Sequence, residues 1–487
     1  MRKVIDQQLQ FGQAPISKIG FNPRHRDSLT KLLRGLQYIY STPAVRQEVW
    51  RILEELAAGR ADLGNGRPGL DLWAVLVMGT LRLNLDWNYD LLLNQVNYHD
   101  LIRQMLGHGP YDFEGQYKLQ TLKDNVGLLT PEALDRINQV VVQAGHAALK
   151  KNGGALMGRC DTFVVETDVH YPTDINLLWD AMRKAVELTA ELAGWAGLPG
   201  WRKSKYWLRE FKRLFRAAQQ AKRPAAASPA RKAKQEDKVR SAHAAYLAEA
   251  EELLGRVRET AALLGGSQGY NLTEVERYAG HARRQMDQVR RRVLLGESIP
   301  HNEKVFSVFE EHTEWVSKGK AGAPVELGLR VGVLEDQFGF ILHHRVMRQE
   351  TDDQVAVPMV EGAKERFPRL QSCSFDKGFH SPDNQTRLSD ILDRVVLPRK
   401  GKLSQEARAI ESEAGFVRAR RQHSAVESAI NALEVHGLDR CPDHGVDGFE
   451  RYVALAVVAR NIQKLGSILL KREARAARRR ARKRLAA

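Results

Sequence analysis

One stretch of alternating apolar and polar residues constrains the fold of this chain more than any other feature. From Glu326 to Val346 the hydrophobic period becomes two, and β-type runs flank the polar turn Glu335-Asp336-Gln337. Most of the chain has the 3.6-residue spacing of amphipathic helices instead. The segment therefore predicts a β-hairpin within a largely helical protein.

The order of the remaining elements predicts the type of sheet. Shorter β-type runs occur at 156–165, 372–376 and 394–398, and helical patterns at about 353–367 and 423–433. The chain thus reads strand, long insertion, hairpin, helix, strand, helix, strand, helix. Apart from the insertion, this is the ribonuclease H order. We predict a mixed α/β fold: a ribonuclease H-like mixed sheet with helices on both faces and a long helical insertion after the first strand.

Changes in pattern along the chain suggest the domain boundaries. Residues 1–150 are expected to form an all-helical N-terminal DNA-binding region, and residues 151–465 a catalytic domain whose helical insertion spans about 180–300. Residues 466–487 form a basic C-terminal helix or tail. Such a tail binds phosphates without sequence preference.

Two features of the N-terminal region support its assignment as helical. Thr130 before Pro131 is a firm helix start, since Thr caps a helix and Pro fits its first turn. Two short helical patterns flank the turn at Asn84–Asp86, with Asp86 as the expected cap of the second. The pair resembles a helix-turn-helix, a motif that any small helical bundle can also contain.

The charge balance indicates the kind of partner. Lys and Arg number 75 against 59 Asp and Glu, a formal net charge of +16, which favours a polyanion and, above all, nucleic acid. Ribosomal or membrane-surface association is the alternative. A membrane role is not expected, because no apolar run approaches the roughly 20 residues that span a bilayer. With no signal-peptide pattern at its start, we expect a cytoplasmic, nucleoid-associated protein with reduced cysteines.

Three acids stand where a metal site for phosphoryl transfer would place them. Asp376 ends a β-type run before Lys377-Gly378, Asp161 lies within the run 156–165, and Glu427 lies on a helical pattern. Cleavage and joining of phosphodiesters by two divalent ions needs hard oxygen ligands, so we predict Mg²⁺, with Mn²⁺ as a substitute. Asp161 is the expected bridge between the two ions. The alternatives are a turn-forming Asp376 and a solvated Glu427.

Asp168 is the main rival of Asp161. It lies seven residues further on, so in a straight strand its side chain points to the opposite face.

Lys318 and Lys320 lie in a basic, aromatic loop before the hairpin and are predicted to contact DNA phosphates. No Walker-type motif occurs, and no histidine pair has metal-ligand spacing, so neither ATP nor structural zinc is expected.

Four blocks of the chain resemble the bacterial insertion-sequence DDE transposases, most closely the ISNCY group. The blocks, which are specific in combination, are 161–174, 312–320, 374–382 and 423–441. The resemblance covers about residues 65–465 and places Asp161, Asp376 and Glu427 at the acidic positions. It implies metal-dependent cleavage at transposon terminal inverted repeats and transfer of the 3′-OH into target DNA. The implied partners are double-stranded transposon ends and target DNA, with the protein a homo-oligomer when bound to DNA.

The chain departs from the family around its glutamate. Many relatives carry Tyr, Arg and Lys at seven before, four before and seven after that residue, where this chain has Arg420, His423 and Glu434. Arg420 and His423 are the predicted DNA contacts near this glutamate, and Lys377 is a further predicted contact. The acidic Glu434 cannot replace a phosphate-binding lysine. The alternative functions are a catalytically inactive DNA-binding regulator or domesticated remnant, and a hydrolytic DNA nuclease.

Overall fold

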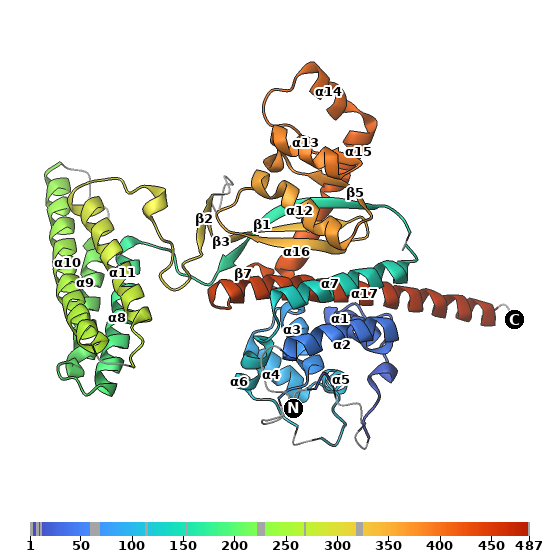
Figure 1. The fold of residues 1–487 in the computed structure, drawn as a ribbon, viewed down its shortest axis with the longest axis horizontal. Coiled ribbons are helices and arrows are strands. Elements are labelled where there is room, and N and C mark those ends of the chain that lie inside the picture. The colour runs from blue at the N-terminus through green and yellow to red at the C-terminus, as the bar shows by residue number, and fades with distance from the viewer. Residues whose placement is uncertain are drawn as a thin grey trace. The chain divides into compact units, whose positions relative to one another are not determined.

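The computed structural model describes residues 3–5, 9, 12–58, 69–112, 115–151, 153–221, 229–266, 269–317 and 325–485. The chain forms two compact units, one from residues 1–168 with 328–487 and one from residues 169–327. The first unit contains the sheet and both ends of the chain; the second is mostly helical (Figure 1).

The strands of the first unit form a mixed sheet. They are β1 (Leu156–Thr167), β3 (Val325–Asp336), β4 (Ile341–Met347), β5 (Leu370–Phe375), β6 (Arg394–Val396) and β7 (Arg440–Cys441). The order across the sheet is β4-β3-β1-β5-β6, with β7 pairing β1 beyond β5. β4, β3 and β1 run antiparallel, whereas β5 and β6 run parallel to β1. The predicted mixed α/β class and the hairpin β3–β4 are confirmed.

The turn of this hairpin falls later than the sequence pattern indicates. β3 continues through Asp336, so the turn begins at Gln337 and not at Glu335. The buried Asp336 carboxylate accepts hydrogen bonds from the backbone N–H groups of Phe338 and Phe340, at 2.8 and 2.9 Å. This short-range capping stabilises the later turn.

Helices surround the sheet on both faces. The helices of the first unit are α1 (Ser28–Ser41), α2 (Pro43–Ala58), α3 (Leu72–Asn84), α4 (Tyr89–Tyr98), α5 (Asp100–Met105), α6 (Leu119–Val126), α7 (Pro131–Leu149), α12 (Asp352–Arg366), α13 (Pro382–Ile391), α14 (Gln405–Ser412), α15 (Ala414–His423), α16 (Ala425–Leu433) and α17 (Gly445–Leu485). Cys160 on β1 packs with the α12 side chains in one hydrophobic cluster, while Phe163 and Val165 pack with α16 and α17 in another. Since side chains alternate along a strand, these residues identify the two covered faces.

The N-terminal helices belong to the same compact unit as the sheet. α17 runs beside α7 and α1 (Figure 1). α1 and α17 cross with almost no space between their backbones: a Cβ at Gly466 would lie 1.8 Å from the Lys31 carbonyl oxygen, and one at Gly35 2.1 Å from that of Ile462. Only glycine fits such a crossing. The N-terminal helices thus share a hydrophobic core with the sheet.

The predicted helix-turn-helix segment differs from expectation at its turn. α4 begins at Tyr89, and its cap is Asn88, whose side chain accepts the Leu91 N–H at 2.8 Å. Asp86 does not cap the helix, because its backbone has a positive φ of 52° in the turn before it. Every residue of α3 is buried, which makes α3 a core helix.

The second unit is a helical bundle, as predicted for the insertion. Its elements are α8 (Asp174–Trp195), α9 (Ser204–Ala221), α10 (Pro229–Gly265), α11 (Thr273–Val289) and the short β2 (Glu314–Ser317). Phe211 of α9 stacks on Tyr246 of α10 at 4.6 Å between ring centroids, within a core shared by all four helices. The aromatic residues of α9 therefore mainly build the core, while Lys205, Arg209 and Lys212 on the same helix are exposed.

One described helix, α17, is long and apolar enough to cross a membrane, contrary to the expectation that no such stretch exists. However, 78% of its apolar window is buried inside the unit. That burial is typical of a core helix in a soluble protein.

Candidate active site

The pairing of β1 with β5 brings Asp161 and Asp376 together. Cys160 pairs with Phe375 in parallel register, and Asp161 and Asp376 are the next residue on each chain segment. β5 ends at this point, and β7 pairs with β1 only from Glu166 onward. The two carboxylates thus stand side by side where the pairing along this edge of β1 is interrupted.

Glu427 reaches the same place from α16. One face of this helix is apolar: Val426, Ile430 and Leu433 are buried, and α16 packs against β1. Glu427 itself is exposed. The single helix expected over 423–433 is instead broken at Ser424, so His423 ends α15 and Glu427 lies in the first turn of the next helix.

The electrostatics of Asp161 reflect how closely the acids are gathered. The pKa of Asp161 is raised to about 6, chiefly by burial and to a smaller extent by the nearby Asp376, Asp352 and Glu427. The Thr162 N–H, which donates to Oδ1 at 2.8 Å, acts in the opposite direction. Several carboxylates that repel one another at one end of a strand are a typical functional arrangement. A cation bound between them would relieve the repulsion.

Asp352 is a member of this cluster that the sequence did not reveal. It is the first residue of α12, and its Oδ1 accepts a hydrogen bond from Thr162 Oγ1 at 2.9 Å. A Cβ at Gly378 would lie 2.8 Å from Asp352 Oδ2, so the carboxylate lies against the turn that follows Asp376. In the sequence, Asp352 has the appearance of an ordinary acid at a helix N-terminus. Its only signal is that it begins the helix that follows the hairpin.

His423 contributes a nitrogen to the same region. Its Nδ1 lies 3.1 Å from Ser374 Oγ, and its Nε2 is buried without a hydrogen-bond partner among the described residues. Burial lowers the pKa of His423, although Asp376 and Glu427 act in the opposite direction. A neutral imidazole thus borders the carboxylates with one nitrogen available for a ligand.

The oxygen donors of these residues suit a divalent cation, but their positions do not form a complete binding site. Within the described ranges, no group of three or more His, Cys, Asp or Glu side chains stands close enough to hold a metal ion. The available donors are nevertheless hard carboxylate oxygens, which Mg²⁺ prefers. Asp376 and Glu427 are exposed, so their side chains have room to rotate toward Asp161.

The other predicted residues lie as follows. Asp168 stands past the end of β1, where Arg440 pairs with it at 3.4 Å. Lys377 is exposed in the turn after Asp376, and Arg420 is exposed on α15. Lys318 and Lys320 lie outside the described residues. Asp376 and Glu427 thus lie near enough to Asp161 to raise its pKa, whereas Asp168 is paired with Arg440 past the end of β1.

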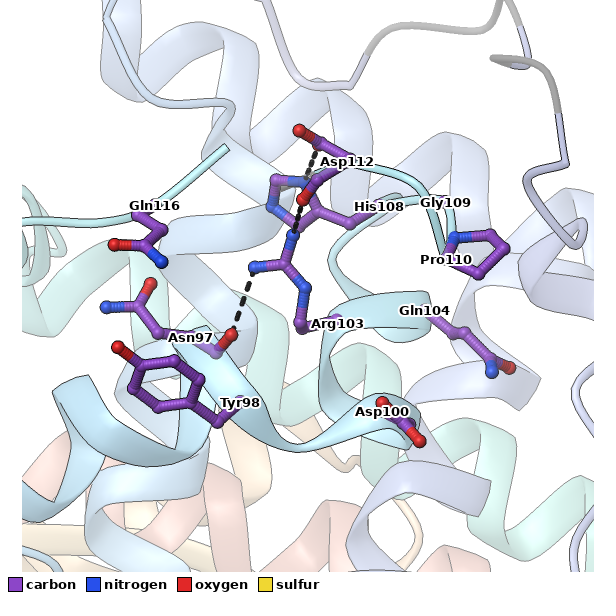
Figure 2. Close-up of a pocket in the computed structure, with 10 residues that line it drawn as sticks. All are labelled: Asn97, Tyr98, Asp100, Arg103, Gln104, His108, Gly109, Pro110, Asp112 and Gln116. Carbon is purple, nitrogen blue, oxygen red and sulfur yellow. Dashed lines mark hydrogen bonds and ion pairs between the residues drawn. The ribbon is translucent and has the colours of Figure 1, made fainter. Parts of the chain in front are cut away.

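A pocket of 340 Å³ lies elsewhere, beside α4 and α5 (Figure 2). Arg103 there donates to the carbonyl oxygens of Asn97 and Asp112, and His108 bonds the Asp112 carboxylate at 2.6 Å. These polar groups hold the loop after α5 in place. Their hydrogen bonds give this pocket a structural role.

Comparison of the chain with protein-family models, with curated proteins and with solved structures returns no match.

Proposed function

We propose that the chain is a DDE transposase with a ribonuclease H-like catalytic core. The strongest support is that the order of the strands and the positions of the three acids occur in combination. Three antiparallel strands, β4-β3-β1, are followed by parallel β5 and β6, with acids at Asp161 on the central strand, at Asp376 after β5, and at Glu427 on a helix packed against β1. Ribonuclease H-like enzymes place their acids in this manner.

The proposed substrates are double-stranded transposon ends and target DNA. Asp161, Asp376 and Glu427 would hold Mg²⁺ or Mn²⁺, and Asp352 would orient Thr162 and the β1 end beside them. Bound ions of this kind activate the attacking oxygen and stabilise the leaving oxygen. The exposed Lys377 and Arg420 would contact phosphates next to the acids. We further propose a cytoplasmic protein that assembles as a homo-oligomer on DNA.

The test is strand transfer with labelled DNA from the ends of the element and a supercoiled target. Inverted repeats around the gene would supply those ends. Wild-type protein should nick the ends and join them to the target in Mg²⁺, and Asp376→Asn and Glu427→Gln should each lower both steps by roughly 10² to 10³-fold. Asp168→Asn is the matched control and should remain active. Full strand transfer by Asp376→Asn would refute the assignment, and binding or hydrolysis without joining would favour a regulator or a nuclease.

A further inference from the structure

A second polar site lies beside the carboxylates on the same face of the sheet. It is a pocket of 290 Å³ between β1, β5, β6 and α15. Arginines line it from three of these elements: Arg159 on β1, Arg394 on β6 and Arg418 on α15. Ser372 and Ser374 form part of its floor. Such a lining of guanidinium and hydroxyl groups suits a phosphate.

The register of the strands places this pocket one row away from the acids. Arg159 lies opposite Ser374 in the register of β1 and β5. Arg159 comes two residues before Asp161, and Ser374 comes two residues before Asp376. Residues two apart on a strand share a face and are separated by about 6.7 Å. Arg394 pairs with Ser372 in the row beyond. Arg159 therefore lies one row from the acids, at about the spacing between consecutive phosphates of one DNA strand, and Arg394 lies one row further along the same cavity.

Two of the arginines are available to a ligand. Arg159 pairs with Glu335 at 3.1 Å, whereas Arg394 and Arg418 are exposed and make no ion pair within the described part of the chain. Gly415 leaves space for this arrangement, since a Cβ there would lie 2.7 Å from Arg394 Nη2. Gly415 and Arg418 are three residues apart and so share one face of α15. Helix and strand thus present both guanidinium groups to the same cavity.

We propose that the pocket of Arg394 and Arg418 binds the phosphate next to the scissile one on the strand that is cut. This inference rests on the proposed function, because the carboxylates define which phosphate is scissile. With one phosphate in the part of the pocket beside Arg159, the next along the strand would lie over Asp161 and Asp376. The pocket would therefore position the cleaved strand without taking part in the bond-making step.

The first test measures binding of inorganic pyrophosphate to the full chain by calorimetry. The double variant Arg394→Gln with Arg418→Gln should weaken binding about tenfold, the scale of lost charge-assisted hydrogen bonds. The matched control is Lys402→Gln with Arg408→Gln, which removes two exposed cations from the same unit. Equal pyrophosphate affinity in the two double variants would overturn the proposal, whether or not the protein acts on DNA.

The second test uses DNA ends with single neutral methylphosphonates. In the wild type, neutralising the phosphate next to the scissile one should weaken binding about tenfold. In the Arg394→Gln, Arg418→Gln variant the same modification should have no effect. If neutralising that phosphate weakens binding of the variant as much as binding of the wild type, the pocket does not bind that phosphate. Cleavage by the wild type would still uphold the proposed function. Absence of cleavage by the wild type would instead count against the function, and the pyrophosphate result would decide on the pocket.

Discussion

The acidic row and the arginine pocket on one face of the sheet carry opposite charge and differ in how the fold holds them. The row of Asp161 and Asp376 gathers acids at the end of β5, and burial with mutual repulsion raises the pKa of Asp161. The adjacent arginine pocket has Arg394 and Arg418 exposed to solvent. Crowding the acids costs folding free energy, whereas the exposed arginines cost little. The difference suggests that the acidic row is maintained for chemistry and the arginine row for binding.

Substitutions of the acids and of the pocket arginines should differ most in whether they lower the cleavage rate or the DNA affinity. Asp161→Asn or Glu427→Gln should lower DNA cleavage by roughly 10² to 10³-fold, the scale of losing one stabiliser of a charged transition state. DNA affinity should hold or rise, because a negative charge is removed. The arginine double variant should behave in the opposite way, with weaker affinity and near-normal cleavage at saturating DNA. Single-turnover cleavage and fluorescence anisotropy would measure the two quantities, and the same defect in both rows would contradict the division of roles.

A variant of Asp352 tests whether this carboxylate belongs to the acidic site. Asp352→Asn should reduce cleavage about tenfold and raise the Mg²⁺ concentration for half-maximal activity, as loss of a group that orients metal ligands does. Asp353→Asn is the matched control, because it removes a charge from the same first turn of α12. Equal activity of the two variants across a Mg²⁺ titration would remove Asp352 from the site.

The third prediction concerns the stability cost of the acids. The folded pKa of Asp161 is raised to about 6, so the folded state takes up a proton more readily than the unfolded state. The penalty of its charge is absent below about pH 4 and complete above the folded pKa. In metal-free buffer, Asp161→Asn should therefore increase the free energy of unfolding by up to about 3 kcal/mol at pH 7.5, since each pKa unit corresponds to about 1.4 kcal/mol.

The gain should shrink as pH falls through the folded pKa toward 5, which urea unfolding at both values would measure. Asp168→Asn is the control, since it removes only an exposed ion pair with Arg440 and should change stability by less than about 0.5 kcal/mol. A loss of stability in Asp161→Asn at pH 7.5 would show that the charge is satisfied within the fold.

The smallest effect tests the space above Gly415. Gly415→Ala should weaken pyrophosphate binding a few-fold by displacing Arg394, since the new Cβ would lie 2.7 Å from Nη2. Stability should hold, because Ala favours a helix over Gly by roughly 0.5–1 kcal/mol. Gly280→Ala, whose Cβ would meet nothing within 4 Å, is the control. Unchanged binding in Gly415→Ala would mean that Arg394 does not need this position.

The acidic row could be predicted from the sequence because its signals are local. A β-type run that ends in Asp376-Lys377-Gly378 shows its own context, and the period of two predicts the hairpin. The arginine row could not be predicted. Arg394 and Arg418 meet only because β6 pairs with β5 and α15 packs beside both, and such pairings are long-range.

Other differences have similar causes. The sequence does not indicate the break at Ser424, because the residues on both sides favour a helix. The pattern favours Asp86 as a cap, whereas Asn88 occupies the N-cap position of α4. The tight crossing at Gly35 and Gly466 is invisible until α1 and α17 are seen to meet. That crossing joins the N-terminal helices to the unit that carries the sheet.

In the proposed mechanism, Asp376 holds a metal ion used in phosphodiester cleavage. The most direct measurement is cleavage of labelled DNA ends by Asp376→Cys in Mg²⁺ and in Mn²⁺, with folding and DNA binding verified. A thiolate is a poor ligand for Mg²⁺ and a better one for softer ions. If Asp376 is a metal ligand, the variant should not cleave DNA in Mg²⁺ and should recover cleavage in Mn²⁺. Full activity in Mg²⁺, or no recovery in Mn²⁺ by a folded, DNA-binding variant, would contradict it.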